Sequence, residues 1–185
     1  MVKKIIIING NSKDGPEKLN LFLKELQLGL VENGKEVNLY NLVNEDIHYC
    51  IGCWNCWWKT PGLCRYEDSM HKILPKIIHS NLVIYSSPMI MGFYSSLLKK
   101  FQDRTIPLVH PYIEYVNNES HHHKRYPVYP KIGVVLDTET ASSEEVELAR
   151  QIFGRFALNF KSEVSFCHSL SNITIKDLVY EAGNI

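Results

Sequence analysis

Short apolar runs alternate along this chain with longer segments in which apolar residues recur at helical spacing. The first run, "KKIIIING", is a continuous β-branched stretch ended by Asn-Gly, and it predicts a strand buried on both faces. After the turn-forming stretch "NGNSKDGP", leucines recur at helical spacing between residues 19 and 30, and Gly34 can supply a left-handed cap. The chain therefore begins with a strand, a turn and a helix.

The same alternation continues toward the carboxyl end. Further strands are predicted in "KEVNLYNL", in "LVIYSSP" with an end near Ser86, in "KIGVVLDT" and in "EVSFCH". Helices are predicted over Asp68–Ile78, residues 94–104 and residues 142–160. Five apolar strands that alternate with helices predict an α/β fold, with one parallel sheet covered by helices on both faces.

Two segments do not fit this alternation, namely residues 48–66 and residues 105–130. The second carries four prolines and no sustained period, so we expect a long loop over one end of the sheet. Its His121, His122 and His123 would point to alternate sides of an extended chain, which favours a solvated or interfacial loop over a shared metal. We expect residues 1–185 to form a single domain with a Cys/Trp-rich insert and this loop.

The net charge and the length of the first apolar run exclude some classes of binding partner. The 20 Lys and Arg balance the 20 Asp and Glu, so no long-range field favours nucleic acid or an anionic membrane surface. The four consecutive isoleucines are far shorter than a signal sequence or the about 20 residues that span a bilayer. We expect a cytoplasmic protein that binds neither nucleic acid nor membrane.

Four of the five cysteines and all three tryptophans fall between Cys50 and Cys64. The C-x2-C-x2-C spacing lets one loop place three thiolates against an iron–sulfur cluster, and Cys64 could close it as the fourth ligand. The same thiolates could hold zinc, although zinc sites usually pair two separated C-x2-C knuckles. A redox dithiol with a labile disulfide, or free thiols packed beside indoles, are the other interpretations. The candidate metal ligands are Cys50, Cys53, Cys56 and Cys64, whereas Cys167 is expected in the core.

Two turns predict a ligand site at the carboxyl edge of the sheet. The first strand, its glycine-containing turn and the next helix place free amide groups there, and such a helix start attracts phosphate. The turn lacks the dinucleotide and P-loop fingerprints, which leaves a mononucleotide phosphate. After the third strand, Pro88 to Gly92 form a rigid apolar ledge for a flat ring. In a sheet of order 2-1-3-4-5, both turns lie where strands one and three diverge.

These motifs together resemble one protein family. "NGNSKDGPEKLNLFL" looks like the phosphate loop and first helix of the flavodoxin-like NAD(P)H-dependent FMN reductases. Residues 87–104 resemble their flavin loop and following helix, and three residues of that pattern match: Lys99, Asp103 and Arg104. The cysteine stretch followed by "EDSM" is similar to the insert of the iron–sulfur flavoprotein branch, and of relatives that keep the cysteines without a cluster. The resemblance covers about residues 3–140.

The resemblance implies a flavodoxin-like doubly wound sheet of order 2-1-3-4-5 that binds FMN. This chain departs from the family where lysines replace the usual arginine and serine or threonine of the phosphate loop, yet lysines still hold phosphate as point charges. Met89 and Ile90 stand where an aromatic residue often follows the proline, and both can pack a ring. The expected FMN-binding residues are Asn11, Ser12, Lys13, Lys18, Ser87, Pro88, Met89, Ile90, Met91, Gly92, Thr138 and Glu139.

The implied function is an FMN-dependent oxidoreductase, either an NAD(P)H-dependent FMN or quinone-type reductase or an iron–sulfur flavoprotein that transfers electrons. NAD(P)H would be the co-substrate, a [4Fe–4S] cluster a second cofactor, and a small molecule or protein the electron acceptor; no residue is assigned as catalytic. The cysteines are expected to act as one unit near the flavin. The Trp-rich loop and part of residues 105–130 are expected to form a homodimer or homotetramer interface. Alternatives are a zinc-stabilised interaction module without catalysis and an electron carrier without turnover.

Overall fold

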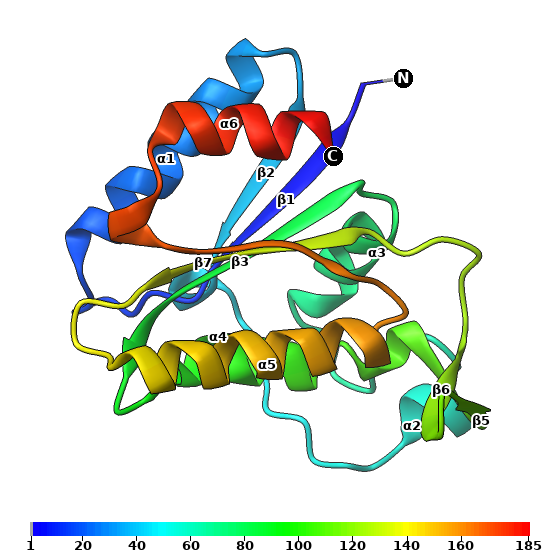
Figure 1. The fold of residues 1–185 in the computed structure, drawn as a ribbon. Helices are drawn as coiled ribbons and strands as arrows, with labels where there is room; N and C mark the ends of the chain where they lie inside the picture. Colours follow the sequence, from blue (N-terminus) through cyan, green and yellow to red (C-terminus); the bar gives the residue numbers. More distant parts are fainter. Residues whose placement is uncertain (1) are drawn as a thin grey trace.

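A parallel sheet of five strands runs through the computed structural model, which describes residues 2–185 (Figure 1). Its order is β2-β1-β3-β7-β8, so the predicted order 2-1-3-4-5 is confirmed with β7 and β8 as the fourth and fifth strands. A short sixth strand pairs antiparallel with the end of β3. The strands are β1 (Lys4–Asn9), β2 (Glu36–Asn41), β3 (Leu82–Ile90), β4 (Phe93–Tyr94), β7 (Lys131–Asp137) and β8 (Val164–Ser169).

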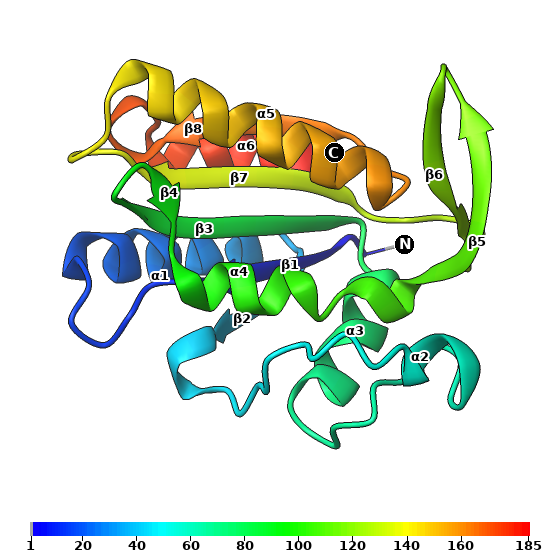
Figure 2. The same ribbon diagram turned by 90° about the horizontal axis from the view of Figure 1, so that it is seen from below.

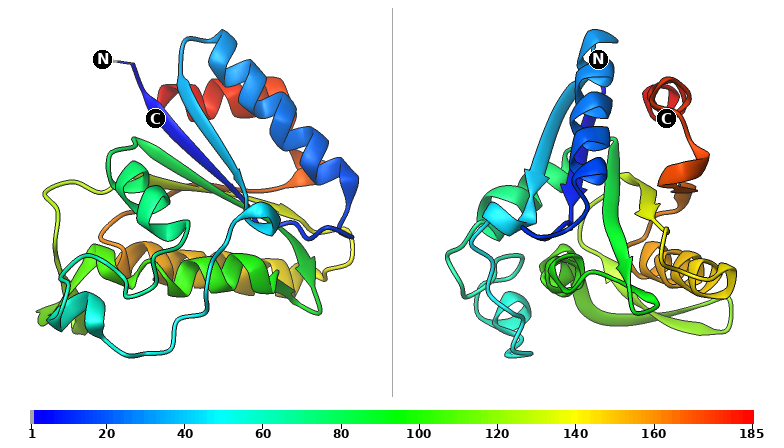
Figure 3. Two further views of the ribbon diagram at one scale, coloured as in Figure 1. Left: turned by 180° about the vertical axis from the view of Figure 1, so that it is seen from behind. Right: turned by 90° about the vertical axis from the view of Figure 1, so that its left-hand side faces the viewer.

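Helices cover both faces of this sheet, as the continuous apolar strands require. One face carries α1 (Glu17–Glu32) and α6 (Ile175–Asn184), and the other carries α3 (Met70–Ile78), α4 (Ser96–Asp103) and α5 (Ser143–Asn159). The end-on view in Figure 3 shows the sheet between the two helix layers. The loops of the chain also contain four short helices: η1 (Leu42–Asn44), α2 (Asn55–Trp58), η2 (Ile106–Leu108) and η3 (Leu170–Asn172).

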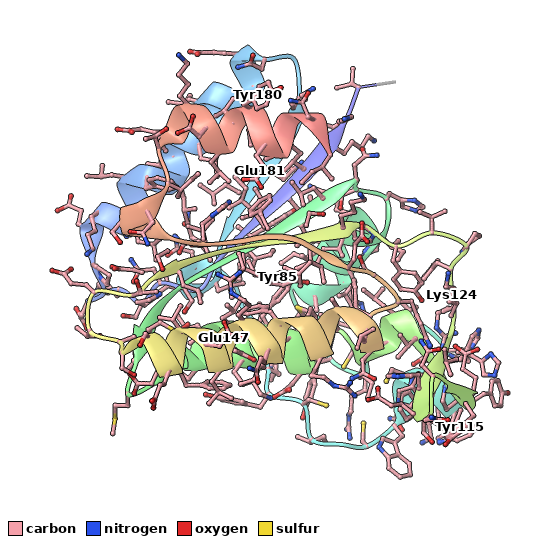
Figure 4. The ribbon with its side chains drawn as sticks, viewed as in Figure 1. Tyr85, Tyr115, Lys124, Glu147, Tyr180 and Glu181 are labelled. Carbon is pink, nitrogen blue, oxygen red and sulfur yellow. The ribbon has the colours of Figure 1, made fainter. Side chains whose placement is uncertain are left out.

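The alternation of side chains along β1 divides the core into two apolar clusters. Ile5 and Ile7 pack with α1 and α6, whereas Ile6 and Ile8 pack with the three helices on the opposite face. Tyr85 lies at the centre of the second cluster, between the sheet and α5 (Figure 4). Each central strand thus contributes to both clusters, which fixes the sheet rigidly behind its carboxyl edge.

The segment predicted as a long loop is a β-hairpin over most of its length. Strand β5 (Val109–Val116) pairs antiparallel with β6 (Glu119–Lys124), and the loop prediction is wrong for these residues. Asn117 and Asn118 both have positive φ, of 51° and 64°, which is the backbone of a tight two-residue hairpin turn. Figure 2 shows the hairpin standing away from the sheet at one end of the molecule.

Two further elements differ from the prediction. Strand β3 continues to Ile90, past the predicted end near Ser86, because its last residues pair with β4. Helix α6 was not predicted, although a capping signal precedes it: the hydroxyl of Thr174 accepts from the amide of Asp177 at 3.2 Å. The buried Leu178 and Ala182 of this helix pack against the same face as α1.

The packing of two glycines predicts opposite effects for one substitution. A Cβ on Gly133 of β7 would lie 2.2 Å from the Phe166 ring, so Gly133→Ala is expected to destabilise the fold by about 1–3 kcal/mol. Gly154, within α5, has no atom within 4 Å of such a Cβ, and Gly154→Ala is expected to stabilise by about 0.5–1 kcal/mol. Urea unfolding of the two variants checks the signs; equal effects would contradict this packing.

Candidate functional site

A cleft of about 400 Å³ opens at the carboxyl ends of β1, β3 and β7. The turn after β1 and the end of β3 both line it, as predicted from the two motifs. Among the predicted ligand-binding residues, Ser12, Pro88, Met89, Ile90, Met91 and Glu139 line the cleft. The others, which lie outside its lining, are Asn11, Lys13, Lys18, Ser87, Gly92 and Thr138.

An asparagine network holds the turn between β1 and α1. The amide nitrogen Nδ2 of Asn9 donates to Asn20 Oδ1 and to Asn41 Oδ1, at 2.8 Å each, and Asn9 Oδ1 accepts from the backbone of Asn11 at 2.9 Å. Asn11 Nδ2 in turn donates to the carbonyl of Pro16 at 2.9 Å. Asn11 was expected to contact a ligand, but its side chain is buried and shapes the turn instead.

Gly15 is needed because the turn folds closely onto Asn11. A Cβ at this position would lie 1.8 Å from Asn11 Oδ1, so no other residue fits without moving the turn. Asn11 Oδ1 is itself buried without a hydrogen-bond partner among the described residues. The turn therefore has a single tight conformation, and the residues that can face the cleft are those next to Asn11, such as Ser12.

The start of α1 provides hydrogen-bond donors beside the cleft. Its N-cap residue, Pro16, has no side-chain cap, so amide groups of the first helical turn have no capping partner. The positive end of the helix dipole lies at the same place. Exposed Lys13 precedes the helix, while Asp14 lines the cleft as a carboxylate. These features suit an anion that is held mainly by backbone amides.

Lys18 connects α1 to the loop after β7. Its ammonium lies 3.1 Å from Asp137 Oδ1 and also forms a short hydrogen bond with Glu139. The hydrogen bonds that the ammonium donates to Glu139 and Asp137 raise the pKa of Lys18, and the Lys18 ammonium lowers the pKa of Glu139. Lys18 was predicted as a free phosphate donor, whereas here both carboxylates already bind its charge.

The end of β3 forms the apolar wall of the cleft. Ser87 is buried: its hydroxyl accepts from the amide of Ser95 at 2.8 Å and donates to the carbonyl of Pro88 at 2.8 Å. Beyond this anchored point, Ile90 is half exposed and Met91 is fully exposed, at 100%. A fixed backbone with mobile apolar side chains at its tip can pack against a flat ring.

Two residues with positive φ set the position of this apolar wall. Met91 and Gly92 have φ of 49° and 78°, and the turn they form lets β4 pair back onto β3. Thr140, from the loop after β7, donates to the carbonyl of Met89 at 3.2 Å and ties this loop to the wall. Five cleft residues were not among the individually predicted ligand-binding residues: Asp14, Gly15, Pro16, Asp137 and Thr140. Asp137 could have been found, because it ends the fourth strand of the sheet at the same edge.

The four clustered cysteines line a second, smaller cavity of about 50 Å³. All four are free thiols; Cys50 and Cys53 are exposed, Cys64 is partly buried and Cys56 is buried. Burial and the neighbouring thiols raise the pKa of Cys56 to about 11, so binding of a metal there must displace a proton. The four cysteines thus share one cavity, and their action as one redox or cluster-binding unit stays a prediction.

The geometry of this cavity bears on what the thiols could hold. Within residues 2–185, no three His, Cys, Asp or Glu side chains come together closely enough to hold one metal ion. A zinc site needs all four ligands about 2.3 Å or less from a common centre, whereas these thiols surround a cavity. Four thiols that line one cavity are the donor set that an iron–sulfur cluster takes, whereas the described residues form no site for a single ion and do not support the zinc-stabilised module.

Helix α4 separates the cysteine cavity from the cleft. At its start, the Ser95 hydroxyl caps the helix and donates to the Gly10 carbonyl in the first turn. Past its end, Arg104 lines the cysteine cavity. The eight residues of α4 span about 12 Å, and Figures 1 and 2 show α2 and β4 at opposite ends of the molecule. The cysteine cavity and the cleft share no lining residue, and the proximity of the cysteines to a flavin stays a prediction.

A buried ion pair anchors the cysteine cavity to the core. Arg104 Nη1 and Nη2 donate to the two carboxylate oxygens of Asp68, at 2.7 and 3.0 Å, and Nη1 also donates to the carbonyl of His48 at 2.6 Å. Asp68 further accepts from the amides of His48 and Met70. Burial alone would raise the pKa of Asp68, but these hydrogen bonds lower it on balance. Removing either partner would leave a buried unpaired charge.

The three consecutive histidines lie on β6 and do not converge. His121 is buried within hydrogen-bond distance of Glu119, at 3.1 Å, while the ring of His122 lies 5.0 Å from that of Trp57. His123 Nδ1 lies 3.6 Å from Glu114 Oε2, on the neighbouring strand β5. His121 is thus buried in a hairpin, and an interfacial role of the segment stays a prediction. As to membranes, none of the helices in residues 2–185 combines the length and apolar character needed to cross a bilayer.

Comparisons with known proteins agree with this geometry. A sequence model described as NADPH-dependent FMN reductase matches residues 3–164. An iron–sulfur flavoprotein of Methanocaldococcus jannaschii is 33% identical over 106 residues, which are 57% of this chain and 53% of that protein. An iron–sulfur flavoprotein of Archaeoglobus fulgidus is 30% identical over 104 residues, which are 55% of this chain and 48% of that protein.

A solved structure shows the same fold over the whole chain. A putative quinone reductase from Klebsiella pneumoniae superposes with a TM-score of 0.66 at 10% identity, covering 100% of this chain and 83% of that one. At this identity the likeness concerns the fold alone. The chain spans about half the length of the two iron–sulfur flavoproteins that it matches.

Proposed function

The chain belongs to the NADPH-dependent FMN reductase family, and from that premise we propose that it is an FMN-binding oxidoreductase that takes electrons from NAD(P)H. The observation that carries the proposal is the cleft at the carboxyl ends of β1, β3 and β7, where the uncapped start of α1 meets an apolar wall. In sheets of this order, FMN binds where strands β1 and β3 diverge. FMN would supply the acceptance of hydride or single electrons, while the chain positions it.

The residues of the cleft divide into a polar and an apolar part. The amides between Ser12 and Lys18 and the hydroxyl of Ser12 would hold the phosphate, because they lie at the positive end of the α1 dipole. Met89, Ile90 and Met91 would pack against the ring system. Asp137 and Glu139 add carboxylates to the cleft, and Lys18 of α1 offsets their charge.

Reversing charge near the start of α1 tests the phosphate position. Lys13→Glu together with Lys18→Glu is expected to weaken FMN binding about tenfold or more, because like charge is placed beside the phosphate and Lys18 no longer offsets Asp137. Quenching of FMN fluorescence on titration measures the dissociation constant. Lys24→Glu, on an exposed part of the same helix, is the matched control and should bind as wild type. Equal affinity in all three proteins would place the phosphate elsewhere.

We further propose that Cys50, Cys53, Cys56 and Cys64 hold an iron–sulfur cluster. Their shared cavity supports this, as do the names of the two relatives described above. Such a cluster would transfer single electrons. The chain contributes the four thiols, a wall formed by Ile106 and Pro107, and the buried Arg104–Asp68 pair behind it. A small molecule or a protein would be the final electron acceptor.

Single Cys→Ala changes at the four positions test the cluster. Each is expected to remove bound iron and sulfide and the broad absorption near the flavin bands, while FMN stays bound because the cleft lies beyond α4. Iron analysis and visible spectra of anaerobically purified protein measure both. Cys167→Ala, on β8, should change neither. Iron-free wild type with one reducible disulfide would identify a dithiol, and four thiols that stay reduced in air would identify simple packing.

We also propose that the chain forms a homodimer or homotetramer through the cysteine loop and the β5–β6 hairpin. Trp57 Nε1 donates to the carbonyl of Val109 at 3.0 Å, which joins the loop and the hairpin into one surface. That surface exposes large apolar side chains, including Tyr115, which is 73% exposed at the tip of the molecule (Figure 4). The exposed set is Tyr49, Ile51, Trp54, Trp58, Tyr112, Ile113, Tyr115 and Val128. Large exposed apolar side chains that gather on one loop and one hairpin are typical of an interface.

Introducing charge into this surface tests the oligomer. Trp58→Asp together with Tyr115→Asp is expected to convert the assembly to a monomer at micromolar concentration, because two carboxylates would be buried in the contact. Light scattering measures the mass. Tyr180→Asp is the matched control, since Tyr180 is equally exposed, at 76%, on α6 at the opposite side (Figure 4). A monomeric wild-type protein would rule the proposal out.

A further inference from the structure

An arginine that lines the cysteine cavity has one hydrogen-bond donor without a partner among the described residues. Arg104 lines the cavity, its residue is only 1% exposed, and its terminal nitrogens Nη1 and Nη2 are used by Asp68 and the His48 carbonyl. The remaining nitrogen, Nε, is buried and has no partner among the residues that the structure describes. Leaving a buried N–H unpaired costs about 1–3 kcal/mol, and more when the group is charged.

The guanidinium cannot turn to satisfy this donor elsewhere. Two hydrogen bonds to Asp68 fix its plane, and Asp68 is itself held by the amides of His48 and Met70. The ring of Tyr66, which also lines the cavity, lies 5.5 Å from Arg104 Cζ and is stacked on His48 at 4.5 Å. The position of the guanidinium is thus set by the surrounding protein before any group enters the cavity.

The charges around the cavity indicate what this donor would meet. Thiolates are anions and sulfur atoms accept hydrogen bonds, so a group held by Cys50, Cys53, Cys56 and Cys64 presents negative acceptors to Arg104. A second arginine, Arg65, lines the same cavity, but it is exposed and its charge is screened by water. The buried arginine is not screened by water in this way, although Asp68 offsets part of its charge.

We propose that Arg104 is a positioning and tuning residue of the cysteine site: its Nε–H donates to a sulfur atom of the iron–sulfur cluster, and its charge stabilises the reduced cluster relative to the oxidised one. This rests on the cluster that forms part of the proposed function. The reduced cluster carries one more negative charge, so a fixed cation and a hydrogen bond to sulfur raise the reduction potential. Asp68 holds Arg104 in place and partly offsets its positive charge.

Redox titration of the anaerobically purified full chain, followed by electron paramagnetic resonance, tests this. Arg104→Lys keeps a cation beside Asp68 but removes the Nε–H, and it is expected to lower the midpoint potential while the iron content stays at the wild-type level. Arg104→Gln with Asp68→Asn removes the donor and both charges without leaving an unpaired ion, and it should also lower the potential. Arg65→Gln, which removes a cation from the same cavity, is the control and should keep the wild-type potential.

The outcomes separate this inference from the cluster itself. Wild-type protein without iron would overturn the cluster and this inference together. Iron-loaded wild type whose potential is unchanged by Arg104→Lys and by the double change, or is lowered equally by Arg65→Gln, would overturn the role of Arg104 alone. If the double change prevents folding, as thermal unfolding would show, Arg104→Lys alone decides. FMN affinity should be unchanged in every variant, since the cleft is at the other end of α4.

Discussion

Burial of the central strands on both faces is the constraint from which the rest of this structure follows. Ile5 to Ile8, and the matching residues of β3 and β7, have no exposed face, so helices must cover both sides of the sheet and every connection must cross from one end to the other. Parallel strands then end at one common edge. The turn after β1, the wall after β3 and the acidic loop after β7 meet there because all three follow the carboxyl ends of neighbouring parallel strands.

The polar interior of the molecule supports its two cavities in different ways. At the cleft, neutral asparagine side chains hold the backbone, so the turn keeps its shape at any pH near neutrality. At the cysteine cavity, the ion pair of Arg104 and Asp68 holds the backbone, and the pair can lie in the core because its net charge is zero. The pair ties the cysteine loop to α4 through Arg104 and to the start of α3 through Asp68.

The strands and their order could be predicted because each strand has a local signal, a β-branched run bounded by turn residues. The β5–β6 hairpin could not, because Pro111 interrupts its alternation and its turn, Asn117-Asn118, lacks the usual glycine. At the site, Ser12 and Pro88 to Met91 were found from turn chemistry. The ion pairs of Lys18 and Arg104 depend on partners more than 30 residues away, Asp137 and Asp68, which no local pattern reveals.

Helix α4 is fastened at both ends, and this gives its length a meaning of its own. Ser95 is tied to the Gly10 carbonyl at the cleft, and Arg104 is tied to Asp68 beside the cysteines. Each residue of an α-helix advances the axis by about 1.5 Å and turns it by about 100°. One residue inserted between these two ties would rotate Arg104 by more than a quarter turn, away from Asp68 and from the cysteine cavity. The number of residues between Ser95 and Arg104 therefore sets the rotation of Arg104 about the helix axis. A helix of similar composition but different length would not keep it.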